Sequence, residues 1–278
     1  MHTITLIETV FYVVRYTGQG MTIFILKLVL TPTLIGLVSL AGRRWGSSVS
    51  GWLTGLPLTS GPVAFFLALN QGNSFASAAA VGILGGTISQ VVFSLAYSWI
   101  ALRHRWQLAL IVSSLIFFIA TAILQALEIS ALMLYVIVVL SLLVGIWLMP
   151  KIAAQNLILS ATPQWDIPAR MIVATSFVLI LTSIAPLLGA HLTGLLSPFP
   201  LYAATLAAFA HHFNGAAPAT RVLRGMLIGL FSFASFFLVL AFLLESSGVA
   251  VAFIAAITVA LAIQSCSLLI MQRARQLR

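Results

Sequence analysis

Nine long apolar segments, separated by short breaks, constrain what this chain can fold into. They lie at about 22–42, 48–70, 76–102, 107–127, 130–149, 168–190, 193–213, 219–244 and 249–271. Each approaches or exceeds the roughly 20 residues with which a helix crosses a hydrocarbon core, and none has the alternation of a membrane strand. Charged residues make up only 6% of the chain, too few to cover a water-facing surface. The sequence therefore predicts an all-α polytopic membrane protein with the lipid bilayer as its surroundings.

The breaks between the segments place almost all basic residues on one side of the membrane. Alternating the nine segments puts eleven lysines and arginines on one side and only Arg15 and Lys27 on the other. Because cytoplasmic loops are enriched in Lys and Arg, we expect the C-terminus in the cytoplasm. The net charge of +9 then reflects topology, and no nucleic-acid partner is expected. A tenth span over residues 3–17 is the alternative, which would place the N-terminus inside as well.

Two stretches of the chain are related to each other. Residues 46–95 align with 189–238 without a gap, with 15 of 50 positions identical, including Pro57 and Pro200. The repeats begin five spans apart, an odd number, so equivalent helices face opposite ways. We predict two inverted-topology repeats, arranged as 4+1+4 spans, or as 5+5 with the tenth span. The single membrane domain, 1–278, then divides into repeat 1 (22–127), a linker helix and loop (128–167) and repeat 2 (168–278).

Two segments, at about 48–70 and 193–213, are interrupted by prolines in their middle. Each proline removes a backbone donor, and a freed carbonyl is costly in hydrocarbon. Unwound backbone is therefore expected between the repeats, lining a cavity, which is a pointer to a transporter's substrate site. Helix N-termini after Pro57 and Pro200 would favour an anionic or carbonyl group. The polar side chains nearby are Thr54, Thr59, Ser60, Ser197, Tyr202 and Thr205. Ordinary proline kinks, with glycines for close packing, are the alternative.

The repeats differ where their second spans end. Repeat 2 carries His211, His212, Asn214, Arg221 and Arg224 there, and repeat 1 carries Asn70 and Gln71. A histidine pair can hold or relay protons near neutral pH, and arginines can pair with phosphate or carboxylate. We include all seven residues in the candidate substrate site. The alternative is that the arginines flank the membrane and the histidines cap the helix at its surface.

Acidic residues are absent from the middle of every span. Glu8, Glu128, Asp166 and Glu245 all fall at span ends or in loops. Because buried carboxylates are the usual ligands of cations in carriers, we expect neither a metal site nor a cationic substrate. No nucleotide loop, nucleophile elbow or paired carboxylates occur, so neither an enzyme nor a cofactor is expected. Lys27 and Arg170 match across the repeat and are expected to reach toward lipid headgroups.

The block Ser197-Pro198-Phe199-Pro200-Leu201-Tyr202, running to Ala210-His211-His212, resembles a known pattern. It is similar to that of the GlpM-like family of small bacterial inner-membrane proteins, which are about one repeat long. The resemblance covers some 40 residues of repeat 2, and repeat 1 departs from it because it has no histidine. It implies a fused, duplicated relative in the bacterial inner membrane.

Three functions fit these features. The first is a carrier that moves a small anionic or polar solute by alternating access through the broken spans. The second is a flippase for a lipid-linked phosphate, with its headgroup held by Arg103, Arg105, Arg221 and Arg224. The third is a membrane subunit or scaffold without transport activity. The glycine-rich helix faces also permit a homodimer.

Overall fold

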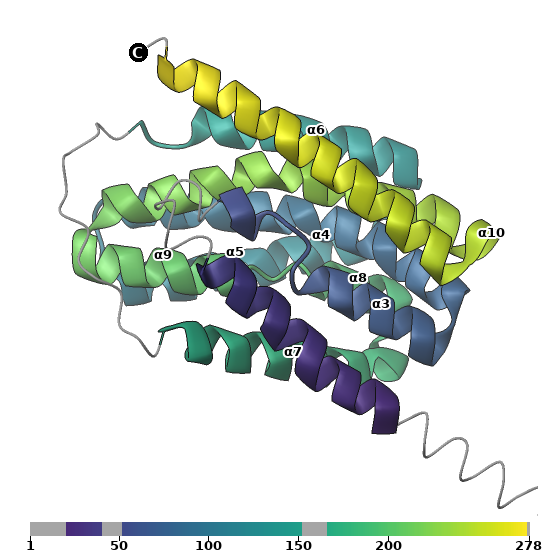
Figure 1. Ribbon diagram of the computed structural model, residues 1–278. Coiled ribbons are helices and arrows are strands. Elements are labelled where there is room, and N and C mark those ends of the chain that lie inside the picture. Colours follow the sequence, from purple (N-terminus) through teal and green to yellow (C-terminus); the bar gives the residue numbers. More distant parts are fainter. Residues whose placement is uncertain (1–20, 41–51, 152–165, 277–278) are drawn as a thin grey trace, which may run out of the picture.

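The computed structural model describes residues 21–40, 52–151 and 166–276, and every regular element within them is a helix. The helices are Met21–Leu40, α3 (Ser60–Gln71), α4 (Asn73–Ile100), α5 (Trp106–Gln125), α6 (Ala131–Leu148), α7 (Asp166–Leu188), α8 (Ala190–Leu196), α9 (Leu201–Asn214) and α10 (Ala216–Gln276) (Figure 1). α10 consists of two arms that reverse direction at Gly248, whose φ of 76° and ψ of 173° are not helical.

The chain is an all-helical polytopic membrane protein. Within the described residues, seven helical stretches are long and apolar enough to cross a membrane. This count treats α8 and α9 as one stretch and the two arms of α10 as another. Every one of the nine predicted segments contains helix. The two segments predicted to be interrupted, at about 48–70 and 193–213, are indeed broken: residues 52–54 are separate from α3, and α8 is separate from α9. The proposed tenth span over 3–17 lies outside the described residues.

Elements of the two halves correspond at the spacing of the sequence repeat, 143 positions. α4 begins at Asn73 and α10 at Ala216, and both follow a glycine with positive φ, Gly72 (90°) and Gly215 (84°). α5 begins at Trp106, and the second arm of α10 follows Gly248, at the matching place. α6 lies between the halves and has no counterpart.

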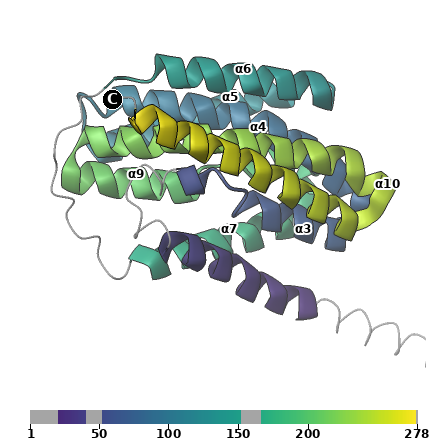
Figure 2. The ribbon, with the colours of Figure 1, turned by 45° about the horizontal axis from the view of Figure 1, so that its top comes forward.

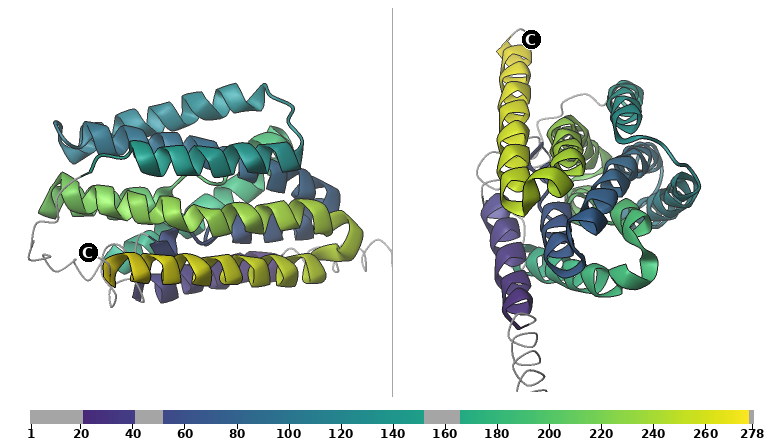
Figure 3. Two further views of the ribbon diagram at one scale, coloured as in Figure 1. Left: turned by 90° about the horizontal axis from the view of Figure 1, so that it is seen from above. Right: turned by 90° about the vertical axis from the view of Figure 1, so that its right-hand side faces the viewer.

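Equivalent helices run in opposite directions through the bundle. The helix Met21–Leu40 runs toward the end of the bundle where the C-terminus lies, whereas its counterpart α7 runs away from that end (Figure 1). Basic residues collect at the C-terminal end, in the connection from α4 to α5, just after α6 and near the start of α10. The connections that contain Glu128 and Glu245 lie at the other end (Figure 3).

α4 and the first arm of α10 form the centre of the bundle. Both are buried over most of their length, and they pack against each other and against α6, while α9 lies along α10 (Figure 2). α5 and α6 stand on one flank and expose most of their apolar surface, as lipid-facing helices do (Figure 3). The site therefore lies where the central pair meets the two broken helices.

Candidate functional site

The first helix break lies between the helical turn at residues 52–54 and α3. The Leu56 N–H donates to the Leu53 carbonyl (3.1 Å), and the Leu58 N–H donates to the Leu56 carbonyl (2.7 Å). The second of these bonds closes a three-residue turn around Pro57. Proline suits this position because it has no N–H that the turn would leave without a partner.

The second break, between α8 and α9, has the same backbone hydrogen bonds. The Phe199 N–H donates to the Leu196 carbonyl (3.0 Å), and the Leu201 N–H donates to the Phe199 carbonyl (2.7 Å), around Pro200. Each bond lies 143 positions after its counterpart. The two breaks are therefore one backbone structure built twice, which sets them apart from incidental proline kinks.

Each break rests closely against a glycine on a helix of the opposite half. Gly55 lies on Gly229 of α10 so closely that a Cβ on either glycine would overlap backbone atoms of the other segment. At the equivalent positions, Gly86 of α4 lies on Pro198, and a Cβ on Gly86 would overlap the proline ring. Glycine is required here because the contact leaves no room for a side chain.

Carbonyl groups released by the breaks accept hydrogen bonds from side chains. The Gln264 Nε2 donates to the Trp52 carbonyl (3.1 Å), while the Ser232 hydroxyl donates to the Gln264 Oε1 (2.6 Å). Across the halves, the Ser60 hydroxyl donates to the Ser197 carbonyl (3.0 Å). Unwound backbone is tolerated at membrane depth when protein groups satisfy it in this way.

Replacing Gln264 with leucine is expected to lower the free energy of unfolding by about 1 kcal/mol, the net worth of a typical hydrogen bond, because the Trp52 carbonyl and the Ser232 hydroxyl each lose one partner. Each keeps a second one, the Gly55 N–H and the Gly229 carbonyl respectively. Thermal unfolding of the purified protein in detergent measures the effect. Gln107→Leu is the matched control, since Gln107 is exposed at the start of α5. Equal stability of the two variants would contradict the bracing role of Gln264.

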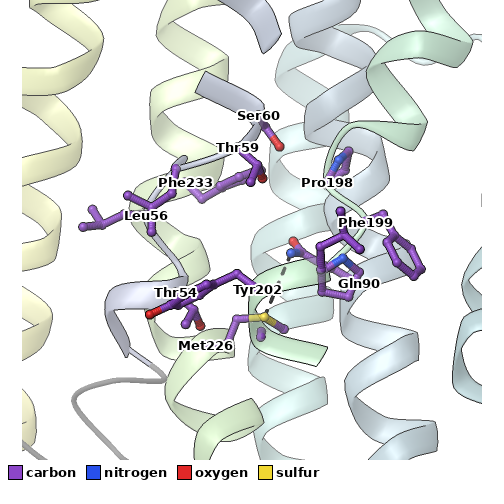
Figure 4. Close-up of a pocket in the computed structure, with 14 residues that line it drawn as sticks. Thr54, Leu56, Thr59, Ser60, Gln90, Pro198, Phe199, Tyr202, Met226 and Phe233 are labelled. Atoms are coloured by element: carbon purple, nitrogen blue, oxygen red, sulfur yellow. Dashed lines mark hydrogen bonds between the residues drawn. The ribbon is translucent and has the colours of Figure 1, made fainter. Parts of the chain in front are cut away.

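A small cavity lies between the two breaks (Figure 4). Its volume is about 20 Å³, room for about one water molecule. Five of the predicted site residues line it: Thr54, Thr59, Ser60, Pro200 and Tyr202. The two unwound segments thus meet at a cavity between the halves, as expected.

Three further lining residues come from the central helices and were not predicted. Gln90 projects from α4, and Met226 and Phe233 project from α10 (Figure 4). Gln90 and Phe233 occupy equivalent positions in the repeat alignment. The sequence does contain a signal for Gln90, because it is a glutamine in the middle of the long apolar run 76–102. Polar side chains inside a membrane span are rare and often functional.

The two basic residues that match across the repeat are buried, so the prediction that they extend to lipid headgroups is wrong. Lys27 is 7% exposed, and its Nζ donates to the Thr182 hydroxyl (2.8 Å) and lies 5.4 Å from the centre of the Phe66 ring. Arg170 is 5% exposed, and its Cζ lies 5.1 Å from the centre of the Tyr202 ring, which lines the cavity. Both side chains therefore lie on helix faces that pack against the bundle and not against the lipid.

The predicted histidines lie at the far end of α9, away from the cavity. His211 is ten residues after the start of α9, about 15 Å along the helix. Its Nδ1 is 3.4 Å from the Tyr97 hydroxyl, and the exposed His212 ring packs edge-on against Trp106. A proton-coupling role for the pair stays a prediction.

The remaining predicted residues lie at helix ends or bond within their own helix. The Arg224 Nη2 donates to the Ile146 carbonyl (3.2 Å), which ties α10 to α6. Thr205 donates to the Leu201 carbonyl of its own helix (2.7 Å). The other four lie outside the cavity, at or near the ends of α3, α9 and α10: Asn70, Gln71, Asn214 and Arg221.

Comparison of the chain with protein-family models, with curated proteins and with solved structures gives no match. The function is therefore argued from the site alone.

Proposed function

We propose that the protein is a secondary-type carrier that moves a small anionic or polar solute across the membrane by alternating access. One observation carries the proposal: two breaks with the same backbone structure, from opposite halves of the chain, meet at one small cavity. In carriers built from inverted repeats, discontinuous helices form the solute site at the interface of the repeats.

Two buried basic residues support an anionic solute. Lys27 and Arg170 hold equivalent positions in the two halves, and both are buried. The partners of the Lys27 ammonium are the neutral Thr182 hydroxyl and the Phe66 ring. A buried ammonium with neutral partners attracts an anion, because its own desolvation is not offset by a carboxylate. The N-termini of α3 and α9, which follow the breaks, add positive dipole ends.

The small volume of the cavity fits a state of such a carrier in which no solute is bound. With room for about one water molecule, it must widen before a solute enters. Exchange of conformation between the two halves would open first one side and then the other, since the halves run in opposite directions. We assign the basic end of the bundle to the cytoplasm of a bacterial inner membrane.

The proposal is tested first by solute binding and then by transport. The purified protein in detergent is heated with a panel of small carboxylates, chloride, nitrate, phosphate and neutral amino acids. A solute at about 100 times its Kd is expected to stabilise the protein by about 2.7 kcal/mol. Proteoliposomes preloaded with that solute should then take up the labelled solute faster than empty ones. An absence of both stabilisation and counterflow across the panel would refute the carrier.

The double substitution Pro57→Ala with Pro200→Ala is expected to reduce counterflow about tenfold or more, a change of ~1.4 kcal/mol in the activation free energy. Alanine restores a backbone donor and favours continuous helix across both breaks. Pro168→Ala is the control, because Pro168 is exposed in the first turn of α7, where proline is tolerated. Wild-type counterflow in the double variant would mean that the breaks have no part in transport.

A further inference from the structure

The cavity between the breaks has two chemically different walls. Equivalent repeat positions carry Thr59 and Tyr202, Ser60 and Ala203, and Gln90 and Phe233. The first half thus contributes hydroxyl and amide groups, whereas the second contributes mainly aromatic and aliphatic surface. Because the positions correspond, the backbone geometry does not explain the difference. A solute with a polar end and an apolar end would match both walls.

Gln90 has an unusual environment for a buried amide. It is 5% exposed, and its Oε1 accepts no hydrogen bond from any group in the described part of the chain. Its Nε2 has Met226 Sδ as its acceptor, at 4.0 Å (Figure 4), and a thioether sulfur accepts hydrogen bonds only weakly. A buried carbonyl oxygen without a donor is costly. Both ends of this amide are therefore available to a bound molecule.

The chemistry of the amide limits what it recognises. Its oxygen needs a donor, such as a hydroxyl or an N–H group, and its nitrogen can donate to an oxygen on the same molecule. Chloride, nitrate and other anions that only accept hydrogen bonds cannot satisfy the oxygen. Phe233, across the cavity from Gln90 (Figure 4), gains nothing from a small inorganic anion but packs well against a hydrocarbon group.

We propose that Gln90 determines the specificity of the site, and that the solute is a small organic anion with a hydrogen-bond donor beside a short apolar body. The donor bonds to Gln90 Oε1, and the body packs on the Phe233 ring. This inference rests on the proposed function, since it takes the cavity to be the solute site.

Pairs of acids that differ in one hydroxyl test the inference directly. Lactate is compared with propionate, and 3-hydroxybutyrate with butyrate, by thermal shift of the full-length protein in detergent and by competition in counterflow. The wild-type protein is expected to prefer the hydroxylated acid of at least one pair by about tenfold or more, because the acid that lacks the hydroxyl leaves Gln90 Oε1 unpaired.

Substitution of Gln90 should remove that preference without abolishing binding. In Gln90→Leu, and in the more nearly isosteric Gln90→Met, the two acids of the pair are expected to bind with similar affinity. Phe233→Leu is the control at the equivalent position of the other half: it should weaken both acids and leave their ratio unchanged. The wild-type comparison does not depend on how well any variant folds.

The outcomes separate this inference from the carrier proposal. Equal affinity of the wild-type protein for both acids of each pair overturns the inference, as does a hydroxyl preference that survives in a folded Gln90 variant. Binding and counterflow of chloride, nitrate or phosphate, with no response to the carboxylates, overturns the inference and leaves the carrier standing. No response to any solute of either panel overturns both.

Discussion

Replacing Gly229 with alanine is expected to lower the free energy of unfolding by about 1–3 kcal/mol, the usual cost of overpacking a tight contact. The added Cβ would overlap the Trp52 carbonyl oxygen and the Cα of Gly55. These are backbone atoms that a rotamer change cannot move, so the first break must shift away from α10. Thermal unfolding in detergent measures the loss.

Gly36→Ala is the matched control for this substitution. Gly36 also lies within a buried helix face, but a Cβ there meets only the Met171 side chain, at an ordinary distance of 3.5 Å. Because alanine favours helix over glycine, this variant should be as stable as the wild type or about 0.5–1 kcal/mol more stable. A Gly229→Ala protein that matches Gly36→Ala in stability would contradict the close backbone contact.

Replacing Lys27 with methionine is expected to reduce binding and counterflow of anions about tenfold or more, because loss of a buried charge partner costs at least ~2 kcal/mol. Stability should stay the same or rise, since an apolar side chain of similar length is easier to bury than an ammonium. This separation of function from stability distinguishes an anion-binding lysine from a structural one. The measurements are counterflow in proteoliposomes and thermal unfolding of the same preparation.

Lys151→Met is the control for charge alone. Lys151 is exposed beyond the end of α6, so its loss should leave both transport and stability unchanged. If Lys27→Met transports anions at the wild-type rate, the buried lysine is not on the path of the solute. If both variants lose transport equally, overall positive charge and not the buried position accounts for the effect.

The helices of this fold could be predicted from the sequence because membrane spans are local. An apolar run of sufficient length and a charged or glycine-containing break define each one, and Gly72 and Gly215 do end α3 and α9. The division of α10 at Gly248 likewise falls at a glycine in the break between the predicted segments 219–244 and 249–271.

The site could be predicted only in part, because its other residues depend on which helix faces meet. Pro57 and Pro200 identify the breaks by themselves, since proline acts on its own backbone. Whether Lys27 faces lipid or protein depends on Thr182, 155 positions away, and nothing local specifies that pairing. The histidines drew attention by their chemistry, but the length of α9 separates them from the cavity.

The close contacts between Gly55 and Gly229 and between Gly86 and Pro198 also bear on how fast the two halves could move in the proposed carrier. Where side chains interdigitate, one helix slides past another only if several torsion angles change together, and each change adds to the activation barrier. Gly55 and Gly229 have no side-chain torsions, and the proline ring that meets Gly86 is nearly rigid. In the proposed carrier, displacement at these two places would require no side-chain rotation at the glycines. The rate of switching would then depend on the groups that must exchange hydrogen bonds, chiefly Gln264 and Ser60.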